Sequence, residues 1–220
     1  MNHILDRVNE VCKCVRDDNQ ELINFKQLIN YTRKTFKKHE FDLVLKTKKE
    51  KDLTLDKFYV MAYYDSESDS DGETPIEVVV HHNLTGTEQF GRHQITNFLV
   101  EIYDAVVHEY RHQYQSQRRS HVEYVDHKTK PYTRYLANQD ELDAYALSIS
   151  IELLRTMDVY RAKRNLSRIS VMSKMRTGAV YSSPTLRAYI GHFGLNGVTR
   201  KLAKKIYRYL ETLDKRNIFM

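Results

Sequence analysis

The segment from about residue 92 to residue 117 is apolar around most of its circumference when it is drawn as a helix. A helix of this kind is surrounded by other elements, so the segment predicts the central helix of a domain. Beyond residue 110 the segment turns polar, with the sequence RHQYQSQRRSH. The helix is therefore expected to leave the core at its C-terminal end. Its apolar positions are Ile95, Phe98, Leu99, Ile102, Val106 and Val107.

A His-Glu-x-x-His motif lies where this helix leaves the core. His108 and His112 are four residues apart, which places both imidazoles on one face of a helix. Glu109 borders that face and points aside. Two neutral imidazoles can hold zinc, while a neighbouring carboxylate takes a proton from water. The motif predicts a catalytic Zn2+ site; the alternative is a solvated helix end with a His/Glu/Arg cluster.

A catalytic zinc site needs a third protein ligand. The metzincin spacing is excluded, because Gln115 and Arg118 occupy the positions where it requires glycine and histidine. Two sources of the ligand then stay open. One is a histidine of the following connection, His121 or His127, and the other is a glutamate on a later helix.

Glu141, in the sequence DELDAYA, is the glutamate that we expect to be the ligand. The 28 residues between His112 and Glu141 leave room for the chain to reverse and present a carboxylate from the next helix. The alternative is a capping box, in which Asn138 begins the helix and Glu141 reaches back to it.

The sequence HEYRH, followed by a glutamate in an E-x-x-A context, resembles the zincin metallopeptidases and, among them, the gluzincin-like group. The chain also resembles small metallopeptidases of tailed bacteriophages. The resemblance covers about residues 57–154 and implies a hydrolase, a zinc-dependent protease acting on a peptide or protein. It implies His108, His112 and Glu141 as metal ligands and Glu109 as general base.

The resemblance also implies a residue that stabilises the oxyanion and an edge strand that pairs with the substrate. Tyr135 is the first candidate for the oxyanion, followed by Tyr132 and His192. The sequence PIEVVVHH, residues 75–82, is in the place expected for the edge strand.

The chain departs from the thermolysin-like pattern on both sides of the glutamate. Asp140 and Tyr145 stand where that pattern has asparagine and aspartate, so it gives no role to Asp143. The Spartan/SprT-type proteases, which degrade DNA-bound proteins, use a third histidine instead. His127 is at a plausible distance for that variant.

The periodicity along the chain predicts an α+β fold in a single domain, residues 1–220. Apolar positions at helical spacing indicate two helices within residues 1–40. FDLVLKTK, KFYVMAYY and PIEVVVHH read as three strands of a small antiparallel sheet, the last two joined by the acidic loop DSESDSDGE. We expect a zincin-like core over residues 41–157, with the motif helix and the glutamate helix. Residues 158–220 form a basic helical portion, with helices in SSPTLRAYI and VTRKLAKKIYRYLETL.

Positive charge is concentrated at the end of the chain. Residues 159–220 hold 14 of the 35 lysines and arginines and only 2 of the 29 acidic residues. This asymmetry favours an acidic partner, with nucleic acid the first candidate. The competing function is therefore a basic protein that binds nucleic acid or an acidic protein, with an incidental or structural metal site.

The remaining sequence features concern the cellular compartment in which we expect the protein. Cys12 and Cys14 are the only cysteines, too few for a disulfide framework, and helix-core positions are expected for them. The N-terminal sequence has no apolar core of a signal peptide, and no apolar run approaches about 18 residues. We expect a cytoplasmic protein, in the host cytoplasm if it is viral, with no membrane partner.

Overall fold

The computed structural model describes residues 2–19, 21–54, 57–65, 69, 74–119, 132–169 and 178–220. Contacts group the chain into two compact units, Met1–Val122 with Phe219–Met220 and Glu123–Ile218, which are described in turn. Both helices and strands are present, so the α+β prediction is confirmed. The prediction of a single domain, with boundaries at residues 40 and 157, stays a prediction.

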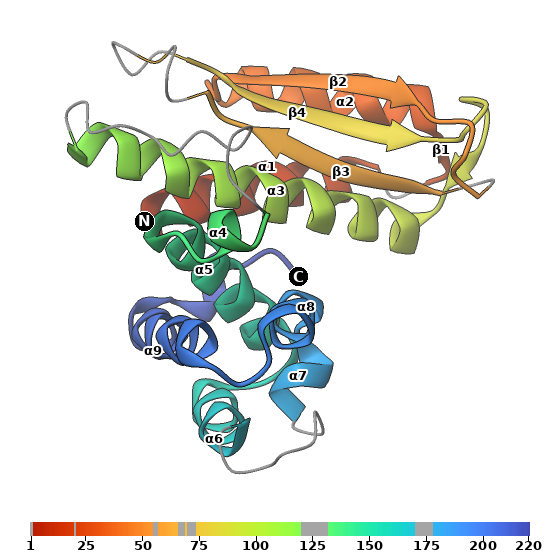
Figure 1. The fold of residues 1–220 in the computed structure, drawn as a ribbon. Helices are drawn as coiled ribbons and strands as arrows, with labels where there is room; N and C mark the ends of the chain where they lie inside the picture. The colour runs from red at the N-terminus through yellow and green to blue at the C-terminus, as the bar shows by residue number, and fades with distance from the viewer. Residues whose placement is uncertain are drawn as a thin grey trace. The chain divides into compact units, whose positions relative to one another are not determined.

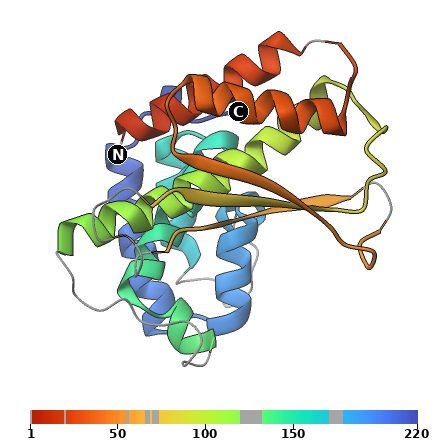
Figure 2. The same ribbon diagram turned by 90° about the horizontal axis from the view of Figure 1, so that it is seen from above.

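In its described residues, the first unit consists mainly of three helices and a three-stranded sheet. The helices are α1 (Asn2–Asp18), α2 (Phe25–Lys38) and α3 (Arg92–Arg119). Helices α1 and α2 lie side by side, and α1 also packs on α3 (Figures 1 and 2). Helix α2 packs on β2, and α3 packs on β3 and β4. Leu5, Val8 and Leu28 are fully buried in this core, as is Cys12.

The sheet consists of β2 (Leu43–Lys49), β3 (Phe58–Tyr63) and β4 (Ile76–His82), in the order β2-β4-β3. The predicted strands are present, but two further expectations are wrong. The sheet is mixed and not antiparallel, because β2 pairs with β4 in parallel while β3 pairs with it antiparallel. PIEVVVHH forms the central strand and not an edge. The apolar run Val78–Val80 explains this position, since a central strand is the most deeply buried.

A two-stranded ribbon completes the first unit. Strand β1 (Ile23–Asn24) pairs antiparallel with β5 (Gln89–Phe90) just before α3 begins. Asn24 is also the N-cap of α2 and forms a capping box with Gln27. The ribbon therefore joins the start of α2 to the chain that leads into α3.

The second unit is helical. Its elements are α4 (Tyr132–Leu136), α5 (Gln139–Thr156), α6 (Val159–Ile169), α7 (Gly178–Ser182), α8 (Pro184–Phe193), α9 (Gly197–Thr212) and the short 3-10 turn η1 (Lys215–Asn217). Helix α5 is its core: Leu142, Leu147 and Ile151 are fully buried, and α9 packs along α5. No helix in the described part of the chain is long and apolar enough to cross a membrane.

Candidate metal centre

Helix α3 holds the His-Glu-x-x-His motif near its C-terminal end. Its N-terminal two-thirds is fixed by packing, since Phe98, Ile102 and Val106 are fully buried against α1 and the sheet. The motif begins directly after Val107, the last residue of the apolar run. The helix backbone therefore holds the two histidines in a fixed position relative to the core.

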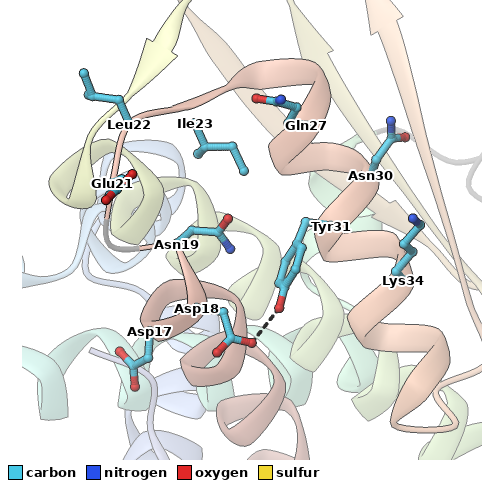
Figure 3. Close-up of a pocket in the computed structure, with 10 residues that line it drawn as sticks. All are labelled: Asp17, Asp18, Asn19, Glu21, Leu22, Ile23, Gln27, Asn30, Tyr31 and Lys34. Carbon is cyan, nitrogen blue, oxygen red and sulfur yellow. Dashed lines mark hydrogen bonds between the residues drawn. The ribbon is translucent and has the colours of Figure 1, made fainter.

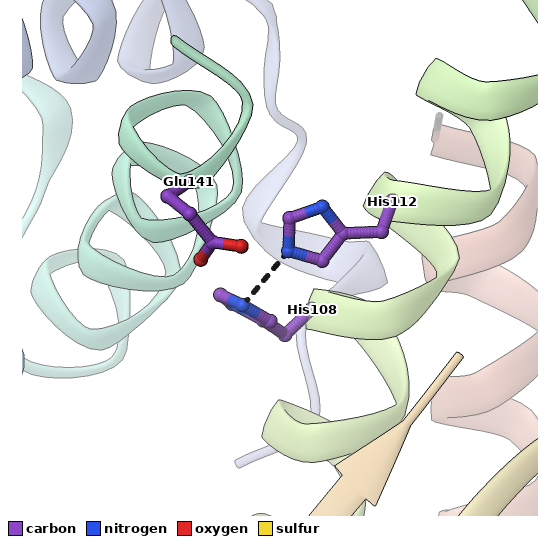
Figure 4. A group of neighbouring side chains, drawn as sticks. All are labelled: His108, His112 and Glu141. Carbon is purple, nitrogen blue, oxygen red and sulfur yellow. Dashed lines mark hydrogen bonds between the residues drawn. The ribbon is translucent and has the colours of Figure 1, made fainter. Parts of the chain in front are cut away.

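The two histidines of the motif point toward one another. His108 Nε2 and His112 Nε2 are 3.2 Å apart, and the ring centroids are separated by 4.9 Å (Figure 4). Two nitrogens that bind one tetrahedral zinc at about 2.05 Å are about 3.3 Å apart. The separation of the Nε2 atoms is thus the one that a shared zinc ion requires.

Gln115 contacts the opposite edge of the His112 ring. Its Oε1 lies 3.1 Å from His112 Nδ1, and both side chains are buried. An amide oxygen can only accept, so Nδ1–H donates and the Nε2 lone pair faces His108. From the sequence, Gln115 was recognisable only as a departure from the metzincin pattern. Its position one helical turn after His112 is the signal that could have identified it.

Glu109 contacts the end of strand β3. The backbone N–H of Tyr64, the residue after the strand, donates to Glu109 Oε2 at 3.1 Å. The same strand contacts α3 two turns earlier, where the N–H of Val60 donates to Glu101. Glu109 is therefore oriented by backbone of the sheet, which the sequence did not reveal.

Glu141 lies in the first turn of α5. Its side chain is 1% exposed. The N-cap is Asn138, whose side chain accepts from the N–H of Asp140, while the Asn138 N–H donates to the carbonyl of Tyr135. In a capping box the glutamate would accept from that N–H. The Asn138 N–H, which a capping box would direct to Glu141, therefore donates to the Tyr135 carbonyl instead.

His108, His112 and Glu141 form a group of neighbouring side chains (Figure 4). One ligand atom from each residue can be chosen so that all lie within 4.8 Å of one another. Two imidazole nitrogens and one carboxylate oxygen are the donor set of many catalytic zinc sites. The three residues therefore offer donor types that suit a zinc ion, and their ligand atoms are neighbours.

The oxyanion candidates lie in the second unit. Tyr135 is half-buried on α4, and its ring contacts that of Tyr132, which is 65% exposed. His192 Nε2 lies 3.2 Å from the Thr133 hydroxyl. The role of Tyr135 stays a prediction, as do those of Tyr132 and His192.

Tyr189 on α8 is a further buried tyrosine of this unit. Its hydroxyl donates to the carbonyl of Leu136 at 3.0 Å, which joins α8 to the end of α4. Burial raises the pKa of Tyr189 well above its usual range, and the neighbouring Tyr145 and Glu141 raise it further. A neutral, hydrogen-bonded Tyr189 is a packing residue of this unit.

Asp143 of α5 has partners within its own unit. Asp143 accepts hydrogen bonds from Lys205 Nζ at 3.2 Å and from the Tyr209 hydroxyl at 3.1 Å, which joins α5 to α9. His121 and His127, the alternative third ligands, lie outside the described residues, as does most of the acidic loop between β3 and β4.

A separate cavity of about 710 Å³ lies at the junction of α1 and α2 (Figure 3). Carboxylates and amides dominate its wall, and the Tyr31 hydroxyl donates to Asp18 at 2.5 Å. That bond raises the pKa of Tyr31. None of its lining residues is a histidine or belongs to the group of His108. The lining residues are Asp17, Asp18, Asn19, Glu21, Leu22, Ile23, Gln27, Asn30, Tyr31 and Lys34.

Comparisons with known proteins find no relative from which a function could be transferred. No protein-family model matches the chain, no curated protein matches it in sequence, and no solved structure matches it.

Proposed function

We propose that the protein is a zinc-dependent metallopeptidase that hydrolyses peptide bonds, of the zincin type that its motif resembles. The observation that carries the proposal is the grouping of His108, His112 and Glu141, whose ligand atoms lie within 4.8 Å of one another. Burial adds support, because His112 is 5% and Glu141 1% exposed. A buried carboxylate is stabilised by a nearby positive charge, which a divalent cation would supply.

His108, His112 and Glu141 would hold the zinc ion, which would supply a water of lowered pKa and polarise a substrate carbonyl. Glu109 is the residue that accepts the proton of the attacking water and delivers it to the leaving amine. The N–H of Tyr64 holds one carboxylate oxygen of Glu109, so the base is oriented before substrate arrives. Tyr135 is the proposed donor to the oxyanion.

The order of the sheet changes the strand that would pair with substrate. Strand β3 is an edge strand, and its end contacts Glu109 through Tyr64. An extended peptide that adds to this sheet would therefore pair with β3 and not with β4, through backbone groups other than the N–H groups of Val60 and Tyr64, which donate to Glu101 and Glu109. Met61 and Tyr63 of β3 are 40% and 48% exposed, so both are accessible to a substrate side chain.

The test is hydrolysis of casein by the zinc-loaded protein, with the zinc content measured on the same sample. Glu109→Gln should lower kcat/KM by about 10²- to 10⁴-fold while zinc stays bound, because only the base is removed. Glu101→Gln is the matched control, since it lies on the same helix and also accepts a backbone N–H of β3. It should leave both values unchanged.

Full activity of the Glu109→Gln protein would contradict the role of Glu109. His112→Ala should lose the metal together with activity, while His93→Ala, an exposed histidine of the same helix, should lose neither. Equal zinc content in these two variants would contradict the metal site itself.

A further inference from the structure

Helix α9 has two contrasting faces. Leu202, Ile206 and Leu210 are buried on one face, which packs on α5. On the opposite face four cationic side chains are exposed, and we call these the basic face of α9: Arg200, Lys201, Lys204 and Arg208. At 1.5 Å per residue they cover about 12 Å along the helix.

The charges of this face are not neutralised by neighbouring carboxylates. Lys205, at its side, pairs with Asp143, and Glu211 at the end of α9 pairs with Lys163 of α6. For the four residues of the basic face, no carboxylate of the described chain lies within ion-pair distance. Like charges at i, i+4 cost a helix roughly 0.2–0.5 kcal/mol per pair. The face therefore stabilises neither the helix nor the fold and is available for a partner.

We propose that the basic face of α9 binds the phosphate backbone of nucleic acid. Duplex DNA carries a negative charge about every 3.4 Å along each strand, so a row of four cations can contact several phosphates together. The face has no asparagine or glutamine for bidentate contacts to adenine. Contacts to phosphate oxygens do not depend on base sequence, and Arg200 and Arg208 are the residues of the face that could also contact guanine.

Charge and burial favour nucleic acid over a lipid surface. A helix that binds in the plane of a membrane inserts an apolar face between the lipids. The apolar face of α9 is used within the protein, where Leu202 and Ile206 are fully buried. The exposed surface of α9 is mainly cationic, which suits a partner with a dense and regular array of anions.

The test is fluorescence anisotropy of a labelled 20-base-pair duplex with the full-length protein between 50 and 200 mM salt. Four phosphate contacts predict a slope of log K against log salt of about −3.6. Lys201→Ala/Lys204→Ala should reduce the magnitude of this slope by about 1.8. The matched control is Arg164→Ala/Arg168→Ala, which removes the same charge from an exposed face of α6 and should leave the slope unchanged.

Three outcomes would overturn the proposal. The first is no binding at 50 mM salt, and the second is an equal loss of slope in both double variants, which would indicate diffuse attraction. The third is equally tight binding of poly-glutamate or of vesicles containing phosphatidylserine. Circular dichroism of each variant, matched to the parent, confirms that the proteins compared are folded. Chelation of zinc should not change the slope, which separates this proposal from the metal site.

Discussion

The motif of α3 and the basic face of α9 present charged or ionisable side chains at the same spacing but in opposite environments. His108 and His112, four residues apart, converge, with their Nε2 atoms at 3.2 Å. Arg200 and Lys204, also four residues apart, are exposed and have no carboxylate partner in the described chain. The same helical spacing thus brings two nitrogen donors together in the motif of α3. On α9 it places separate positive charges along the surface of the helix.

Burial decides which of these two uses a polar side chain can have. Both ring nitrogens of His112 have a directed contact, Nδ1 with Gln115 and Nε2 with His108, so the loss of one neighbour should weaken the binding of a metal there. On α9 water screens the cations, so single changes should be small and roughly additive. Four predictions, one of them with a pair of variants, test the role of burial, and they follow in order of decreasing effect.

Gln115→Leu should have the largest effect of the four. The change removes the acceptor that fixes the tautomer of His112, and loss of such a partner typically weakens metal binding 10- to 100-fold. Zinc affinity measured by competition with a chelator checks this, with Gln113→Leu on the same helix as control. Cobalt substitution adds an absorption spectrum that reports ligand geometry without activity. Unchanged affinity and spectrum would show that the Nδ1 contact has no role.

Glu101→Gln should change how stability depends on pH. Burial raises the pKa of Glu101 to about 7, although the N–H of Val60 opposes the shift. The protonated form is therefore favoured in the folded state. Its contribution to the free energy of unfolding is complete below pH about 4.5 and is lost as pH rises through about 7. Relative to the variant, the parent should lose about 1–2 kcal/mol over this range, a value reduced for solvent screening. Parallel pH profiles from urea unfolding would contradict this assignment.

Tyr189→Phe should cost about 1 kcal/mol of stability, because the carbonyl of Leu136 loses a buried hydrogen bond. Catalysis should be unaffected. Tyr135→Phe should do the reverse, lowering kcat with little change in the melting temperature. Thermal unfolding and casein hydrolysis of both variants check the two roles. A large loss of kcat in Tyr189→Phe would reassign the oxyanion donor.

Lys204→Ala should have the smallest effect, within about 0.5 kcal/mol of the parent free energy of unfolding. Its side chain is exposed and forms no ion pair within the described chain, and its removal relieves repulsion from Arg200 and Arg208. Urea unfolding provides the measurement. A loss above 1 kcal/mol would mean that the basic face supports the fold and is not reserved for a partner.

The elements with strong periodicity were predictable from sequence, and their arrangement was less so. The three strands and helices α3, α5 and α9 lie close to where the apolar pattern placed them. Strand order was not encoded locally, because alternation reports which face is buried and not which strand is central. Helix α6 was not predicted. Among its described side chains only those of Ala162 and Leu166 are fully or nearly fully buried, so its apolar pattern is weak.

For the candidate site, the pairing of His108 and His112 was predictable from the sequence, since helical geometry relates i to i+4. The choice of Glu141 as a candidate also came from the sequence, through its spacing from His112. The partners around them did not. Tyr64 reaches Glu109 through a backbone N–H, which has no sequence signature. Whether Glu141 takes part in a capping box likewise needed the structure, in which the Asn138 N–H donates to the carbonyl of Tyr135.

The decisive measurement for a zinc site at His108, His112 and Glu141 is the zinc content of the purified, tag-free protein. Glu141→Ala and Asn138→Ala samples are measured beside it. We predict about one zinc per chain in the parent, a clear loss in Glu141→Ala, and full retention in Asn138→Ala, which removes only the helix cap. A parent without zinc after reconstitution, or a Glu141→Ala protein that binds as much zinc as the parent, would contradict the account.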